Sequence, residues 1–106
     1  MCALIFKFLL GHVLVDFALQ PTSMARGKCR NNKSDEKYVP TWPYWLTAHA
    51  LIHGGAVWLV TGNMVLGILE VFLHWIIDFA KCENWTNIHT DQLLHIICKA
   101  IYLFIL

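Results

Sequence analysis

Four long apolar stretches constrain the fold more than any other feature of the sequence. They cover residues 2–20, 42–61, 64–80 and 88–106. Each has roughly 17–20 residues, enough for a helix to cross a hydrocarbon core of ~30 Å. Backbone in lipid must close its hydrogen bonds within helices or a barrel, and four stretches are too few for a barrel. We therefore predict an all-α fold, a single transmembrane domain over residues 1–106 that forms an integral membrane four-helix bundle, up-down-up-down.

Composition agrees with a chain whose solvent is lipid. Hydrophobic residues make up 58% of the 106 residues and charged residues only 14%, whereas about a quarter of the residues in a soluble domain are charged. The formal net charge is +1, so no global field attracts nucleic acid. The expected partner is the lipid bilayer, and nucleic acid is not expected.

The polar connections predict an orientation in the membrane. Residues 21–41 form a basic loop, and residues 81–87 form a short polar link. Because cytoplasmic loops carry an excess of Lys and Arg, we expect both segments in the cytoplasm and both termini outside. Cys29 and Cys82 flank the membrane segments on that side, where we expect reduced thiols. The loop contains Arg26, Lys28, Arg30, Lys33 and Lys37, opposed by Asp35 and Glu36.

Each apolar stretch carries one pair of His or Asp residues spaced four apart, and residues four apart share a helix face. The pairs lie alternately near the end and near the start of successive stretches. In an antiparallel bundle this alternation brings all four pairs to one level, close to the cytoplasmic face. The pairs are His12 and Asp16, His49 and His53, His74 and Asp78, and Asp91 and His95.

Five imidazoles and three carboxylates at one depth suit a divalent metal, with zinc as the first choice. Eight ligands suffice for two ions, and one ion with carboxylates that orient the histidines is equally compatible. The alternative is structural, since His and Asp also join helices by hydrogen bonds in membranes. Ionisable groups in lipid are costly and tend to mark function, which favours a metal or proton-handling site.

Two further polar residues lie deeper in the expected bundle. Glu70 is two turns from Asp78, and Lys99 is two turns from Asp91 in the same direction. We predict a structural ion pair between Glu70 and Lys99; the alternative is that Lys99 extends to the membrane surface. Gly54 and Gly55 are expected to permit close helix contact.

The motifs also resemble a small bacterial and phage membrane family catalogued as domain of unknown function 3307. The resemblance starts at the stretch from Leu10 to Gln20, followed by residues 24–28, and later stretches match in order: His49 to His53, His74 to Asp78 and Asp91 to His95. It covers nearly the whole chain. It implies a multi-spanning protein of the bacterial inner (cytoplasmic) membrane and gives no activity. Glu70 departs from the family pattern.

The leading functional hypothesis is a membrane-embedded, metal-dependent hydrolase that acts near the cytoplasmic face on a phosphoester, ester or amide. The histidines and carboxylates of the four pairs would be metal ligands, with Asp16, Asp78 and Asp91 as catalytic candidates. Substrate, which includes anionic lipid or another phosphate-bearing molecule, would contact Gln20, Arg26, Lys28 and Gln92.

Two other classes of function use the same residues. A metal-ion or proton transporter would be lined by them, but the outer halves of the helices look too apolar for a continuous path. A non-catalytic interaction protein, such as a phage factor that binds a host membrane protein, would use the polar cluster for structure alone.

Overall fold

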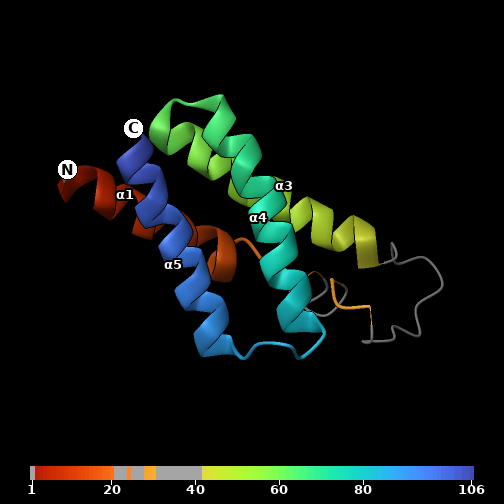
Figure 1. Ribbon diagram of the computed structural model, residues 1–106. Coiled ribbons are helices and arrows are strands. Elements are labelled where there is room, and N and C mark those ends of the chain that lie inside the picture. The colour runs from red at the N-terminus through yellow and green to blue at the C-terminus, as the bar shows by residue number, and fades with distance from the viewer. Residues whose placement is uncertain (1, 21–23, 25–27, 31–41) are drawn as a thin grey trace.

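The computed structural model describes residues 2–20, 24, 28–30 and 42–106, and all regular structure within these ranges is helical (Figure 1). Four helices are present in the described part: α1 (Cys2–Val13), which continues into a π-helical turn, η1 (Leu14–Ala18), then α3 (Trp42–Thr61), α4 (Met64–Cys82) and α5 (Ile88–Ile105). The all-α, four-helix prediction is confirmed. The first helix ends at Ala18 instead of residue 20, α4 extends two residues further than expected, and α5 ends one residue earlier.

Asparagine side chains start the last two helices. The Asn63 side chain accepts hydrogen bonds from the backbone N–H groups of Val65 and Leu66, and Asn87 accepts one from that of Thr90. These bonds satisfy donors that the first turn of a helix leaves unpaired. Gly62, with φ of +69°, closes the turn between α3 and α4 in a conformation that favours glycine.

Adjacent helices run in opposite directions, and an apolar cluster marks one end of the bundle. This cluster contains Phe8, Val57, Leu66, Cys98 and Tyr102, with Leu4, Val60, Leu73, Ile77 and Leu103 packed against it. Its buried residues come from α1, the end of α3, the start of α4 and the end of α5. Figure 1 shows the two chain termini and the α3–α4 turn on this side. The opposite ends of the helices carry the polar pairs.

The distribution of side chains is inverted relative to that of a soluble domain. Eleven polar or charged residues are buried among those described, against nine hydrophobic ones. Large apolar side chains lie on the outside, with Leu59 82% and Phe104 92% exposed. By length and composition, α5 is the one described helix apolar enough to cross a membrane. A core helix of a soluble protein can have the same properties, so four membrane spans stay a prediction.

Among the described residues, glycines allow α3 and α4 to pack closely against each other. A Cβ added to Gly54 would lie 2.7 Å from the carbonyl oxygen of Gly67 and 2.3 Å from Val71 Cγ2. A Cβ on Gly67 would lie 2.9 Å from the carbonyl oxygen of Gly54. Gly55 has nothing within 4 Å of its added Cβ. Of the two glycines expected to allow close contact, Gly54 does so and Gly55 does not.

We predict that Gly54→Ala destabilises the fold by about 1–3 kcal/mol, the usual cost of overpacking. Gly55→Ala is the matched control, and the better helix propensity of alanine should leave stability unchanged or raise it by up to ~1 kcal/mol. Thermal and denaturant unfolding in detergent, followed by circular dichroism, measures both. Equal stability of the two variants would contradict the packing of Gly54 on Gly67.

Candidate metal centre

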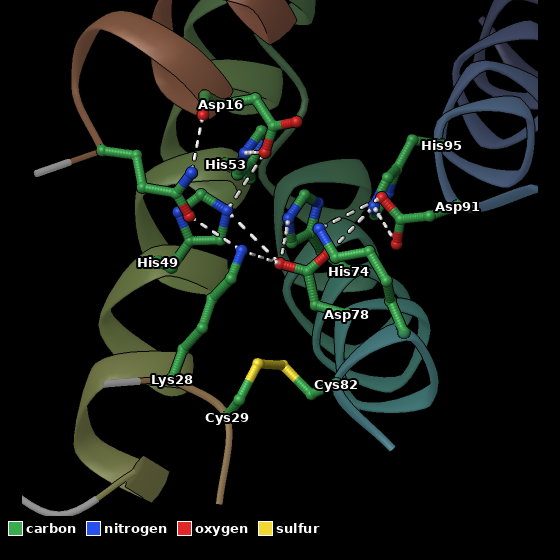
Figure 2. A network of polar contacts seen from close by, with 12 residues as sticks. Asp16, Lys28, Cys29, His49, His53, His74, Asp78, Cys82, Asp91 and His95 are labelled. Atoms are coloured by element: carbon green, nitrogen blue, oxygen red, sulfur yellow. Dashed lines mark hydrogen bonds and ion pairs between the residues drawn. A yellow bond between two sulfur atoms is a disulfide. The ribbon is translucent and has the colours of Figure 1, made fainter. Parts of the chain in front are cut away.

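The structure brings the eight predicted ligands into one region at the polar end of the bundle (Figure 2). We call these residues the polar cluster: His12, Asp16, His49, His53, His74, Asp78, Asp91 and His95. Each is at least 91% buried. Their role as ligands or catalytic groups stays a prediction, whereas their proximity is a feature of the fold.

The π-helical turn η1 places Asp16 in this cluster. The backbone N–H of Leu19 bonds the carbonyl oxygen of Leu14 at 2.7 Å, a five-residue step instead of the usual four. The Gln20 side chain donates to the Asp16 carbonyl oxygen at 2.8 Å and holds the chain where the helix ends. Turns of this kind are frequent at functional sites. The spacing of polar residues in the sequence did not predict this π-helical turn.

Two helices, α3 and α4, surround Asp16 with imidazoles. Asp16 Oδ1 lies 3.2 Å from His49 Nε2 and 3.3 Å from His53 Nε2. Together with His74, these residues form a buried group in which one ligand atom from each lies within 4.8 Å of all the others. In Figure 2, Asp16 points from η1 toward the two histidines of α3. We call this group the primary site.

Asp78 joins the primary site to a second group. Its Oδ2 lies 3.2 Å from His74 Nε2 and 3.3 Å from His49 Nε2. Its Oδ1 lies 3.1 Å from His95 Nε2, which is 3.5 Å from Asp91 Oδ1. Asp78, Asp91 and His95 therefore form another set that could hold a cation. One carboxylate faces both sets, which is the position of a bridging ligand.

Two nitrogens and one carboxylate oxygen of the polar cluster are buried close to other polar atoms without a hydrogen bond. The Nε2 atoms of His53 and His74 and Asp91 Oδ1 are buried and make no hydrogen bond. Carboxylate oxygens nevertheless lie 3.2–3.3 Å from the two nitrogens. Ligands bonded to zinc at ~2.0–2.1 Å in a tetrahedron are about 3.3 Å apart. Buried polar atoms that converge without pairing are costly, and a cation at their centre would satisfy them.

Glu70 orients His74 for such a role. His74 Nδ1 lies 3.2 Å from Glu70 Oε1, and an ionised carboxylate only accepts hydrogen bonds. The Nδ1 atom therefore carries the hydrogen, which leaves the Nε2 lone pair directed at the primary site. A carboxylate behind a histidine is the usual support of a metal ligand. Glu70 is paired with Lys99 at 2.5 Å, as the sequence predicted, and also accepts from the Tyr102 hydroxyl at 2.5 Å. The contribution of Tyr102 was not foreseen.

Gln92 links the two halves of the polar cluster. Its amide nitrogen donates to Asp16 Oδ2 at 2.9 Å and to Asp91 Oδ2 at 3.2 Å. Its carbonyl oxygen lies 2.9 Å from His12 Nε2. His12 thus bonds Gln92 and belongs to none of the three potential metal-binding groups. These contacts use Gln92 inside the fold, where it positions carboxylates.

Lys28 reaches the polar cluster from outside the helices. Its side chain is 3% exposed, and Nζ lies 3.0 Å from Asp78 Oδ2 and 2.7 Å from Gln20 Oε1. Lys28 and Gln20, both predicted to bind substrate, contact each other, and Lys28 also contacts Asp78; substrate binding by these residues stays a prediction. Arg26, the remaining predicted substrate-binding cation, lies outside the described residues.

Cys29 and Cys82 form a disulfide, so the prediction of reduced thiols was wrong. Their Cα atoms are 5.0 Å apart. Residue 29 lies across the end of α4, and contacts of its neighbours Lys28 and Arg30 hold it there. Arg30 pairs with Glu83, which raises the pKa of the Arg30 guanidinium. Figure 2 shows the disulfide below Asp78 and beside Lys28. The sequence had predicted both cysteines on one side of the bundle, and this was the feature that could have indicated the disulfide.

Comparison with known proteins agrees with the resemblance. No curated protein and no solved structure matches the chain. The family described as protein of unknown function (DUF3307) matches residues 4–106. The chain therefore belongs to this family.

Proposed function

We propose that this protein is a membrane-embedded, metal-dependent hydrolase. One group of side chains carries the proposal: Asp16, His49, His53 and His74, whose buried ligand atoms all lie within 4.8 Å of one another. A divalent ion bound there would lower the pKa of a bound water toward neutrality and supply a nucleophile. Imidazole with carboxylate favours zinc over magnesium or calcium, which prefer oxygen ligands.

The balance of buried charge supports a cation at this place. Of the groups that the structure describes, four carboxylates are buried, those of Asp16, Glu70, Asp78 and Asp91, and two ammonium groups, those of Lys28 and Lys99. With neutral histidines these six groups carry an excess of two negative charges, which one divalent ion would neutralise. Lys81, which is partly exposed, lies 3.8 Å from Asp91 and offsets part of this excess. Uncompensated charge in a low-dielectric interior is expensive. The stacked rings of His53 and His74, 3.7 Å apart, favour neutral imidazoles, the form that binds metal.

The exterior supports insertion of the whole bundle in a bilayer. Apolar side chains exposed on all four helices include Phe6, Leu59, Val65 and Phe104, and lipid is the solvent that suits such a surface. The lengths of α3, α4 and α5, 20, 19 and 18 residues, suit a hydrocarbon core of ~30 Å.

A small cavity between α1 and α3 has room for about one water molecule. It has walls of Phe8, Ala56, Val57 and Val60, and it also reaches His12, His53 and Lys99. The proposed substrate is an anionic phosphoester or an ester that reaches the site from the surrounding lipid. Asp78 and Asp91 are the candidates for a general base, because both lie in the cluster outside the primary site.

A metal-ion or proton transporter is the second candidate. It is favoured by the chain of polar contacts from Lys28 through Asp78 and His74 to Glu70 and Lys99. In the part of the chain that the structure describes, the apolar cluster around Phe8, Val57 and Leu66 lies beyond it, which disfavours a polar route to the other end. A non-catalytic interaction protein would need no metal and is the outcome if none binds.

The disulfide bears on the orientation of the bundle. Disulfides persist in oxidising compartments and are rare in the cytoplasm, so we propose that the polar end faces away from the cytoplasm. This reverses the orientation with termini outside and loop 21–41 cytoplasmic. The Lys and Arg residues of the loop favour the opposite orientation under the positive-inside rule, and the disulfide is the observation that favours this one. Both termini would then lie in the cytoplasm.

Metal content tests the proposed site. Wild-type protein purified in detergent and supplied with zinc should retain it after desalting, as measured by inductively coupled plasma mass spectrometry. The double variant His53→Ala with His74→Ala should lose the zinc, because it removes two of the four primary ligands. His89→Ala is the matched control, since His89 is exposed, and it should retain the wild-type content. A metal-free wild type with intact helices would rule out the hydrolase.

Reporter fusions at Leu106 test the orientation. A green fluorescent protein fused there should fluoresce, because it folds in the cytoplasm, and an alkaline phosphatase fusion should be inactive because its disulfides need an oxidising compartment. The reverse pattern, an active phosphatase and a dark fluorescent fusion, would restore the orientation given by the positive-inside rule.

A further inference from the structure

Three consecutive residues fasten a short segment across the polar end of the bundle. We call Lys28, Cys29 and Arg30 the strap. Lys28 bonds Asp78 and Gln20, Cys29 is bonded to Cys82, and Arg30 bonds Glu83 and lies over the Phe79 ring. Four of these partners lie at or near the C-terminal end of α4. The strap therefore has one covalent anchor, with a non-covalent anchor on either side of it.

The strap delivers a positive charge to a carboxylate that faces two metal-binding groups. Lys28 Nζ lies 3.0 Å from Asp78 Oδ2, the oxygen that faces His49 and His74 of the primary site. With this oxygen bonded to Lys28, Asp78 cannot use it to bridge two ions. The other oxygen, Oδ1, faces His95 and, through it, Asp91. Without Lys28 the buried groups would carry three excess negative charges instead of two. The Lys28 ammonium thus supplies positive charge that another cation would otherwise have to supply.

The group beyond Asp78 has the features of an unfilled cation site. Asp78, Asp91 and His95 are each 1% exposed, and their ligand atoms lie within 4.8 Å of one another. Asp91 Oδ1 makes no hydrogen bond although it is buried. The other cation nearby, Lys81, is 3.8 Å from Asp91 Oδ2 and partly exposed, so it can move away. Carboxylate oxygens and imidazole nitrogens are both ligands of zinc.

We propose that the strap is a redox-controlled gate on a second divalent-cation site formed by Asp78, Asp91 and His95. While Cys29 and Cys82 are bonded, Lys28 stays on Asp78 and the polar cluster takes one ion, at the primary site. Reduction by a dithiol breaks the S–S bond: the two sulfurs take up two electrons and two protons, and the donor becomes a disulfide. The strap then loses its covalent anchor, Lys28 leaves, and Asp78 bridges two ions.

This inference rests on the proposed function, because it assumes that the primary site binds metal. It adds a condition under which the centre changes from one ion to two. Paired ions that share a bridging carboxylate are a common arrangement in hydrolases and clamp both oxygens of a displaced phosphoryl group. The gate would thus couple the metal content of the centre to the supply of thiols at the polar end.

The test counts zinc ions per chain in full-length protein in detergent, after desalting. Oxidised wild type should hold one. Lys28→Met, which keeps the disulfide and adds no thiol, should hold two. The pair Cys29→Ser with Cys82→Ser should also hold two, and it separates release of the strap from zinc binding by free thiols. Lys7→Met is the matched control, because Lys7 is exposed on α1, and it should hold one.

Each other result has a definite meaning. One ion in Lys28→Met overturns the second site but leaves the proposed function intact. Two ions in Lys28→Met with one in the serine pair overturns the redox control alone. Two ions in oxidised wild type overturns the gate. No ion in any variant overturns the proposed function itself, and the inference with it. Circular dichroism of each variant verifies that the helices are formed.

Discussion

The charge that this small bundle buries governs the rest of its structure. Four carboxylates and five imidazoles lie at the centre of helices whose outer surfaces are apolar. Within the described ranges of the chain, the two buried ammonium groups, Lys28 and Lys99, neutralise half of that carboxylate charge, and the partly exposed Lys81 lies 3.8 Å from Asp91. Asp78 is the focus, because its two oxygens contact three histidines and Lys28. A centre of this kind is stable only when its charge is balanced, which is why a cation is central to the proposed function.

The sequence predicted the elements of this arrangement that depend on helix periodicity. Pairs of His and Asp four apart define a helix face, and their alternation between helix ends places them at one level in antiparallel helices. The contact between Glu70 and Lys99 followed from the same reasoning about depth. Gly54 was correctly expected at a close helix contact. Its neighbour Gly55 was expected there too but faces open space, so the sequence did not tell which of the two glycines faces α4.

Other parts of the centre depend on the irregular backbone, which periodicity does not describe. The π-helical turn shifts Asp16 toward α3, and the first helix ends two residues before the apolar stretch does. Lys28 lies in a loop that the sequence assigned to the membrane surface, yet the Cys29–Cys82 bond and the Arg30–Glu83 pair bring it to Asp78. Tyr102 reads as an ordinary apolar position in α5, and only the folded chain shows its hydroxyl on Glu70.

X-ray absorption at the zinc edge of the purified, zinc-loaded protein tests the metal centre most directly. We expect a first shell of nitrogen and oxygen atoms at about 2.0–2.1 Å, with the outer-shell signature of several imidazoles and no sulfur. This pattern should vanish in the variant without His53 and His74. A shell of sulfur atoms at about 2.3 Å, which would place the zinc on cysteines, or no retained zinc at all, would contradict it.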